Sequence, residues 1–314
     1  MQETNRIAES TVSLTDSILH YRQIHGRTFQ NSKTTEYWAP NDDQQNDGLD
    51  ITHHYLTLLL DDQLFLAPLG DHPQNVLDIG TGTGIWAMDF ADQFPSAEVV
   101  GTDISPIQPS WVPPNCKFEI DDAQMPWTWP VNRFDFVHIR NLHGSIRDWP
   151  ALYAQCFRHT KPGGFVEELE FDIATKSDKV GPDHIFVQWN NLFAECGEKM
   201  GRTFKVAAQM KQQIIDAGFV DVVQKKWKVP IGGWASDPKL KLVGQYTLLF
   251  LDQSLEGFAL YMLKEIMGWE YDEIQVLVAK MRQALKDWRL YPYYEMYSAT
   301  FYFPLCPQRS VVNH

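Results

Sequence analysis

Short apolar runs alternate with amphipathic segments over residues 75–229. The segments between the runs, such as IWAMDFADQF (85–94) and PALYAQCFRHT (150–160), carry apolar residues at helical spacing. The predicted buried strands are, in chain order, NVLDIG (75–80), AEVVGTD (97–103), CKFEIDDA (116–123), FDFVHIR (134–140), FVEELEF (165–171), VDVVQKKWKV (220–229) and a final YYEMYSATFYF (293–303). This alternation predicts a parallel sheet with right-handed helical crossovers.

The residues before the first strand are predicted to form a cap, residues 1–72, that is mostly helical. Within it, YRQIHGRTF (21–29) and ITHHYLTLLLDDQLFLAPL (51–69) carry apolar residues at helical spacing. The polar stretch APNDDQQNDGLD (39–50) is rich in Asn, Asp and Gln, so we expect it to be the loop between the two helical segments.

The remainder of the chain, residues 73–314, is predicted to be one Rossmann-like α/β domain. Two helical insertions are expected within it, at about 175–217 and 237–289. YDEIQVLVAKMRQALKDW (271–288) in the second insertion has a clear period of about 3.6 residues. No linker, low-complexity run or internal repeat divides the chain.

Composition narrows the classes of partner. The net charge is −13 and there is no Lys/Arg block, which argues against nucleic acid and anionic membranes as partners. The 4 cysteines lie far apart without a CxxC pair, so a reducing compartment is expected. The polar start MQETNRIAES predicts no signal peptide, and no apolar stretch is long enough for a spanning helix. We expect a cytoplasmic protein, or a nuclear one if its role is regulatory.

The glycine-rich turn after the first core strand predicts a nucleotide-type cofactor. Gly80 and Gly82 fit the dinucleotide pattern G-x-G-x-x-G, but Ile85 stands at its third glycine. The pattern here is D-x-G-x-G-x-G, with Asp78 in front and a glycine at 84. A carboxylate beside the turn suits a cofactor that presents a cationic amino group, which favours S-adenosylmethionine (SAM). A purely structural glycine turn is the alternative.

Two more strand-end carboxylates favour the same cofactor. Asp103 lies 21 residues after Gly82, at the end of the second core strand, where a carboxylate accepts hydrogen bonds from ribose hydroxyls. Asp122 ends the third strand and is placed to accept from an adenine amino group. A single such residue would be interpreted as a solvated Asp, but three at consecutive strand ends point to SAM.

Histidines are the candidates for acid–base chemistry. His138 lies within the fourth strand and is predicted to be a hydrogen-bonded core residue. His143 follows that strand at the carboxyl edge of the sheet, where ligands bind in open α/β folds, so it is a candidate general base. A loop histidine with local hydrogen bonds fits its position equally well. We expect no metal, since neither the histidine pairs nor DQQNDG (43–48) has ligand spacing.

Aromatic residues supply candidates for a substrate pocket. There are 11 Trp and 12 Tyr, and most will be core. The candidates for lining a pocket are Trp127, Trp129, Trp149, Trp189, Trp234, Tyr246, Tyr293 and Tyr297. Of these, Trp149, Trp234, Tyr246 and Tyr293 are the selected substrate-pocket residues.

These motifs together resemble a known family. VLDIGTGTGIWAMDFADQFPSAEVVGTDISPIQPSWVPPNCKFEIDD (76–122), FDFVHIRNLHGSIRDWP (134–150) and KPGGFVEELE (161–170) are similar to fungal LaeA-like methyltransferases, also called the UMTA type. YRQIHGRTF, PNDDQQNDGLDITHH, AGFVDVV and VPIGGW share the resemblance, which covers nearly the whole chain from residue 21. It implies a class I methyltransferase fold: a seven-stranded, mostly parallel sheet with an antiparallel last strand. It also implies SAM as cofactor and S-adenosylhomocysteine (SAH) as product.

The resemblance also assigns cofactor contacts. It places Asp78, Gly80 and Gly82 at the methionine end and Asp103 at the ribose, and it counts Thr81 and Ile104 among the cofactor-binding residues. Asp122 and Ala123 belong to the adenine, Arg140 matches a position near the cofactor, and Tyr21, His25 and Arg27 match a segment that resembles a lid. The chain departs from the family pattern at Gly48, where a basic residue is usual, and in its last strand, which lacks the usual His and basic tail.

Three functions are compatible with these observations. The first is methylation of a small apolar or aromatic secondary metabolite, with oxygen of a carboxyl or a hydroxyl as acceptor. The second is a LaeA-like regulatory protein that binds SAM and acts through protein partners. The third is a methyltransferase fold recruited for a rearrangement without methylation. The absence of a long polar or basic extension favours the first. The sequence contains no signal for an oligomeric state.

Overall fold

The computed structural model describes residues 20–32 and 34–304. A sheet of 7 strands forms its centre, in the order β5-β4-β3-β6-β7-β9-β8. The strands are β3 (Asn75–Ile79), β4 (Glu98–Asp103), β5 (Cys116–Ile120), β6 (Phe134–Arg140), β7 (Thr160–Lys176), β8 (Val220–Pro230) and β9 (Tyr293–Tyr302). The first five of these pair in parallel, whereas β9 runs antiparallel to both β7 and β8. The expected class I topology is therefore confirmed.

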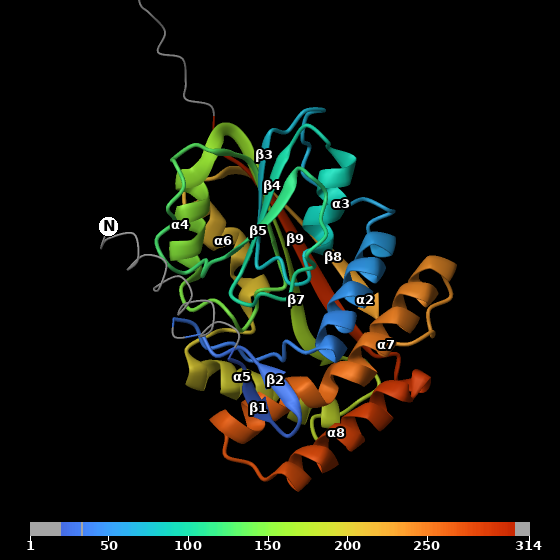
Figure 1. Ribbon diagram of the computed structural model, residues 1–314. Coiled ribbons are helices and arrows are strands. Elements are labelled where there is room, and N and C mark those ends of the chain that lie inside the picture. The colour runs from blue at the N-terminus through green and yellow to red at the C-terminus, as the bar shows by residue number, and fades with distance from the viewer. Residues whose placement is uncertain (1–19, 33, 305–314) are drawn as a thin grey trace, which may run out of the picture.

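Helices cover both faces of this sheet. α4 (Trp149–His159) and α6 (Met210–Asp216), with the short η1 (Val206–Ala208), pack on one face through a buried apolar cluster. α3 (Ile85–Gln93) packs on the other face. Figure 1 shows these helices on the two sides of the twisted strands.

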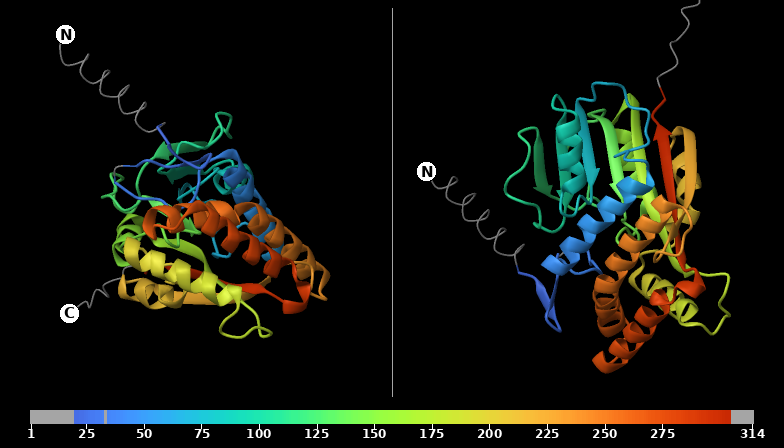
Figure 2. Two further views of the ribbon diagram at one scale, coloured as in Figure 1. Left: turned by 90° about the horizontal axis from the view of Figure 1, so that it is seen from below. Right: turned by 90° about the vertical axis from the view of Figure 1, so that its right-hand side faces the viewer.

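A second helical layer lies beyond the sheet edge at which β3, β4 and β6 end. It contains α5 (Ile185–Met200), α7 (Pro238–Ala259), the π-helical η2 (Leu260–Ile266), α8 (Tyr271–Lys286) and η3 (Trp288–Leu290). This layer has its own buried core, to which Ile24 and Phe29 also contribute. Figure 2 shows the layer below the strands, with α2 (Asp43–Leu59) beside α7.

The N-terminal part of the cap differs from the sequence prediction. Residues 21–29 do not form a helix but a hairpin of β1 (Arg22–Ile24) and β2 (Arg27–Phe29). The turn uses His25 at φ 45° and Gly26 at φ 82°, a pair of left-handed residues that closes a two-residue hairpin. Any structure of residues 1–19 lies outside the described residues.

The predicted polar loop at 39–50 is also wrong for most of its length. α2 begins at Asp43, because the side chain of Asp42 accepts a hydrogen bond from the backbone N–H of Gln45 and caps the helix. Gly48 then lets α2 approach α7: a Cβ there would lie 3.2 Å from side-chain atoms of Phe250, Gln253 and Ser254. The polar and small residues of this stretch therefore cap a helix, at Asp42, and allow a close helix–helix contact, at Gly48.

Candidate functional site

The glycine turn after β3 forms the floor of a cavity at the carboxyl edge of the sheet. Gly80 and Gly82 have φ angles of 67° and 59°, in the left-handed region that favours glycine. A Cβ at Gly80 would lie 2.4 Å from Leu142, so a side chain there would displace the cavity wall. The backbone N–H of Thr81 donates to the carbonyl of Thr102, which ties the turn to β4.

Asp78 supports this turn from below and does not line the cavity. One carboxylate oxygen accepts the Thr81 hydroxyl at 2.6 Å, and the other lies 2.7 Å from His138 Nδ1. His138 is buried and stacks on Trp86, with 3.7 Å between ring centroids. Burial lowers the pKa of His138 even though Asp78 opposes the shift. Asp78 therefore binds an internal donor with each oxygen and lies outside the cavity lining, which argues against a direct contact with a cofactor.

Asp103 and Asp122 do line the cavity, together with Ile104 and Ala123. Asp103 accepts the backbone N–H groups of Gly82 and Ser105, each at 2.9 Å. Burial raises its pKa to about 6. Each oxygen accepts one backbone N–H, which leaves lone pairs for a further hydrogen-bond donor from the cavity that Asp103 lines.

Arg140 supplies the positive charge of the cavity. Arg140 is half-buried, and the desolvation of its guanidinium lowers its pKa. Nη1 and Nη2 donate to His53 Nδ1 at 3.2 and 3.3 Å. Within the described ranges no carboxylate pairs with Arg140. A half-buried guanidinium that lines a cavity and has no carboxylate partner is suited to an anionic ligand group.

This set of residues fits an adenosyl amino acid. A cofactor of that kind needs hydrogen-bond acceptors for ribose hydroxyls and an adenine amino group, and a cation for its carboxylate. Asp103, Asp122 and Arg140 supply these groups around one cavity, and the two glycines leave the backbone open to close approach.

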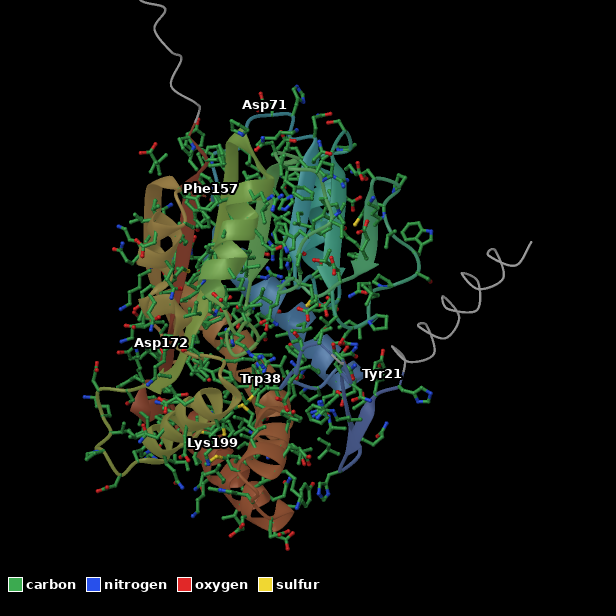
Figure 3. All side chains as sticks on the ribbon, turned by 90° about the vertical axis from the view of Figure 1, so that its left-hand side faces the viewer. Tyr21, Trp38, Asp71, Phe157, Asp172 and Lys199 are labelled. Carbon is green, nitrogen blue, oxygen red and sulfur yellow. The ribbon has the colours of Figure 1, made fainter. Side chains whose placement is uncertain are left out.

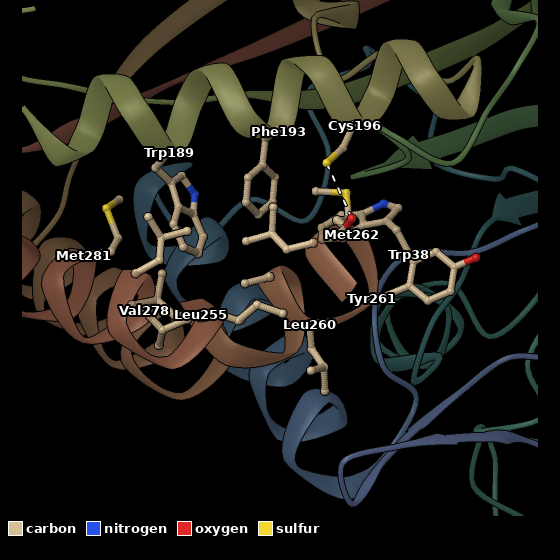
Figure 4. Packing of buried hydrophobic residues seen from close by; sticks show 14 of the residues in the cluster. Trp38, Trp189, Phe193, Cys196, Leu255, Leu260, Tyr261, Met262, Val278 and Met281 are labelled. Atoms are coloured by element: carbon tan, nitrogen blue, oxygen red, sulfur yellow. Dashed lines mark hydrogen bonds between the residues drawn. The ribbon is translucent and has the colours of Figure 1, made fainter. Parts of the chain in front are cut away.

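A second, mostly aromatic cavity adjoins the first. The two share Tyr37, Leu49, Thr52 and Asn141. The aromatic residues that line the second cavity include Trp38, Tyr55, Trp189, Phe193, Phe250, Phe258 and Tyr294. Trp38 lies where the sheet edge meets the helical layer (Figure 3). Phe193 of α5 packs edge-on against Trp38 and lies between it and Trp189 (Figure 4). The second cavity is therefore enclosed by the helical layer on one side and the sheet on the other.

His143 lines the aromatic cavity, at the carboxyl edge of the sheet where the sequence predicted it. Its Nδ1 lies 2.9 Å from Glu170, a fully buried carboxylate of β7 that also accepts the backbone N–H groups of Leu142 and His143. An ionised Glu170 accepts from Nδ1–H, so the ring's free lone pair is on Nε2. In the part of the chain that the structure describes, Nε2 makes no hydrogen bond. Glu170 was not among the residues selected from the sequence. The available signal was a carboxylate within a predicted buried strand, on the face opposite to Leu169.

Asn141 lies at the junction of the two cavities. Its backbone is left-handed, with a φ of 58°, and its N–H donates to the carbonyl of Leu169. Its side-chain Oδ1 is buried and has no partner among the described residues. A strained backbone with an unsatisfied polar atom is a common feature of binding sites.

Three residues of the expected lid lie elsewhere. Arg27 pairs with Asp42 through two hydrogen bonds of 2.5 and 2.8 Å and so anchors the start of α2. His25 stacks on Tyr271 of α8, at the outer end of the hairpin. Neither of these residues, nor Tyr21, lines the described cavities.

The segment after the hairpin covers the first cavity instead. The Gln30 side chain donates to the carbonyl of Ile104 at 2.7 Å, and the Thr35 hydroxyl donates to Asp122 at 2.6 Å. Thr35 and Tyr37 line the cavity. The sequence had no periodic pattern here that marked these residues.

The four selected substrate-pocket residues also lie away from the aromatic cavity. Trp149 is buried between α4 and the sheet, in the core of that face. Trp234 donates to the carbonyl of Pro292, and Tyr293 faces Lys228 at 3.7 Å from its ring centroid. Tyr246 packs against His54. None of the four lines the aromatic cavity, whereas Trp189, from the longer list, does.

Comparison with known proteins assigns the family. A family model described as a methyltransferase domain matches residues 51–224. The methyltransferase pytC of Aspergillus terreus is 39% identical over 87% of this chain and 85% of its own length. The secondary metabolism regulator LAE1 of Cochliobolus heterostrophus is 31% identical, over 86% of this chain and 90% of its own. The chain belongs to the LaeA-like methyltransferase family.

This LaeA-like protein is a methyltransferase of the class I fold, and the cofactor of the family is SAM. Its relatives point to secondary metabolism in fungi. A further relative, the protein-methionine methyltransferase laeA of Emericella nidulans, is 30% identical over 87% of this chain and 74% of its own length. No helix in the described ranges is both long and apolar enough to cross a membrane.

Proposed function

We propose that this LaeA-like protein methylates an oxygen atom of a small, largely apolar or aromatic metabolite. The observation that carries the proposal is the His143–Glu170 pair on an aromatic cavity that adjoins the cofactor cavity. Such a pair serves an acceptor that must lose a proton, which favours a hydroxyl over a carboxylate. Oδ1 of Asn141, which lacks a partner, also suits an acceptor with an O–H group.

The residues of the first cavity hold the cofactor in this proposal. Arg140 binds its carboxylate, Asp103 accepts from its ribose, and Asp122 with Ala123 binds its adenine. Asp78 acts indirectly, because it fixes Thr81 and thereby the glycine turn. Bound SAM supplies a methyl group already activated by a sulfonium.

The residues of the second cavity act on the acceptor. The aromatic walls exclude water and hold a flat apolar acceptor in line with the first cavity. His143 Nε2 takes the proton of the acceptor hydroxyl, and Glu170 keeps Nδ1 protonated and the ring in place. Asn141 orients the hydroxyl at the junction of the cavities.

A first experiment identifies the acceptor. The protein is incubated with isotope-labelled SAM and extracts of its source, and products heavier by one labelled methyl group are sought by mass spectrometry. The proposal expects a small, apolar product labelled on oxygen. Label recovered only in protein would contradict it and would favour a protein acceptor, the activity in the name of the laeA relative at 30% identity.

With the acceptor in hand, His143→Ala should lower turnover by about 10²–10⁴-fold while SAH affinity stays nearly unchanged. Glu170→Gln should cause a smaller loss, because it weakens the hold on the ring but leaves Nε2 in place. His72→Ala, at an exposed loop residue, is the control. A His143→Ala variant with full turnover would remove the residue from catalysis, and a loss confined to acceptor affinity would indicate a carboxylate acceptor.

A further inference from the structure

A chain of three polar side chains leads from the cofactor cavity to the surface of the molecule. Arg140 at the end of β6 donates from Nη1 and Nη2 to His53 Nδ1. His53 lies on α2, and its Nε2 lies 2.9 Å from the carboxylate of Asp89 on α3. The side chains of His53 and Asp89 are 6% and 53% exposed. These three side chains therefore link a half-buried cation to a solvated anion through one buried imidazole.

The protonation state of His53 follows from its partners. A guanidinium has only donors, so Nδ1 of His53 must be the acceptor and carry no proton. Nε2 then carries the proton and donates to Asp89. In this one neutral tautomer both ring nitrogens form a hydrogen bond, and a ring flip would break both, so the ring orientation is fixed.

A neutral acceptor orients Arg140 without neutralising it. A carboxylate at the position of His53 would pair with the guanidinium and compete with the carboxylate of any ligand. The imidazole fixes one side of the guanidinium and leaves its full charge for the cavity. Asp89 is too distant to form an ion pair with Arg140, although its charge favours the cationic form.

We propose that His53 and Asp89 are positioning residues that hold Arg140 ready for the carboxylate of the cofactor's amino-acid end. This inference rests on the role proposed for Arg140 above. It assigns a function to His53, the first residue of the His53–His54 pair, and to Asp89, which lies outside the glycine motif. It also predicts that the two residues affect only the part of a ligand that bears the carboxylate.

Two ligands separate this role from general stability. SAH contains the amino-acid end, and 5′-methylthioadenosine contains the adenosine and a thioether but lacks that end. Affinities for both are measured by calorimetry on the full chain. His53→Phe keeps an aromatic ring but removes the hydrogen-bond acceptor. It should lower the affinity for SAH by about tenfold or more, while the affinity for 5′-methylthioadenosine changes by less than about twofold. His53→Asn places an oxygen near the position of Nδ1 and should recover most of the loss.

Matched controls lie next to each residue. His54→Phe changes the neighbouring histidine, which is exposed on the same helix. Asp89→Asn should weaken SAH by a smaller factor than His53→Phe, whereas Asp92→Asn, at an exposed residue one turn further along α3, should have no effect. Should His53→Phe fail to fold, Asp89→Asn compared with Asp92→Asn provides the test.

Arg140→Met tests the assumption beneath the inference. Suppose that Arg140→Met loses affinity for SAH alone while His53→Phe binds SAH as the wild type does. That result would overturn the positioning role of His53 and leave the role of Arg140 intact. Equal loss of both ligands in His53→Phe would also overturn it, because that pattern reports a structural role. If Arg140→Met binds SAH as the wild type does, the proposed role of Arg140 itself fails.

Discussion

At the scale of single residues, two carboxylates on neighbouring strands have different surroundings. Asp78 is enclosed by side-chain donors, the Thr81 hydroxyl and His138, and faces away from the cavity. Asp103 accepts only backbone N–H groups and has one side on the cavity. A strand-end Asp in a sequence does not reveal which arrangement it will have, because the difference depends on residues from β6 and from the turn.

The raised pKa of Asp103 predicts a pH dependence of cofactor binding. Ribose hydroxyls donate to the ionised carboxylate, so binding favours that form and lowers its pKa. SAH affinity should therefore rise as the pH increases through about 6 and level off above it. Asp103→Asn should bind more weakly, by about 1–3 kcal/mol at pH 8, and should lose this dependence. Calorimetry between pH 5 and 8, in about half-unit steps, measures both effects; a slope that persists in Asp103→Asn would assign the titration to another group.

At the scale of elements, the core strands were predictable and the cap was not. β3, β4 and β6 are short, largely apolar runs bounded by turn residues, and this local signal does not depend on distant contacts. The hairpin at 22–29 has only Ile24 and Phe29 as buried apolar residues, because these two face the core of the helical layer. They are five positions apart, which fits neither one face of a helix nor one face of a single strand. The His25–Gly26 pair was the available signal, since it supplies the two left-handed residues of a tight hairpin turn.

The contact between the hairpin and α2 should stabilise the cap without contributing to cofactor binding. Burial alone would raise the pKa of Asp42, but its pairing with Arg27 lowers that pKa overall. Arg27→Met should reduce the free energy of unfolding by about 1.5–3 kcal/mol, because it removes two charge-assisted hydrogen bonds at a half-buried site. The difference should begin to shrink as the pH falls below about 4, where Asp42 of the unfolded chain becomes protonated, and it should be lost once the pH passes the lowered pKa of Asp42 in the folded protein.

Thermal and denaturant unfolding measure this effect, and Arg289→Met at an exposed ion pair serves as control. SAH affinity should stay within about twofold of the wild type, since Arg27 does not line the cavity. A large loss of SAH affinity with unchanged stability would restore Arg27 to the cofactor site that the family resemblance implied.

At the scale of the whole molecule, the aromatic cavity lies between two layers with separate cores. Its walls come from the segment before α2, from α2, α5 and α7, and from the sheet edge. No short stretch of sequence contains the pocket, so aromatic content alone could not select its residues. Tyr294 and Tyr293 illustrate this limit: they are adjacent on β9, yet one lines the cavity and the other faces Lys228.

The same arrangement makes the segment between the hairpin and α2 the part that should respond to a bound cofactor. Gln30 and Thr35 bridge to Ile104 and Asp122 across the first cavity, and Tyr37 lines both cavities. We propose that this segment acts as the lid, in place of the three residues expected from the family. A cofactor under the segment adds contacts that its open form lacks, so binding should shift the segment toward its closed form.

Hydrogen exchange followed by mass spectrometry tests the lid. Saturating SAH should slow exchange of the backbone amides at 34–38 by about tenfold or more, whereas amides of α8, which packs on the far side of the helical layer, should change little. Thr35→Val removes the hydroxyl that bridges to Asp122 and should reduce the protection while the glycine turn stays protected. Equal exchange at 34–38 with and without SAH would show that the segment is a fixed wall. Protection spread evenly over α8 and the lid would instead indicate that SAH stabilises the whole fold, because a local closure cannot slow exchange in a helix that it does not contact.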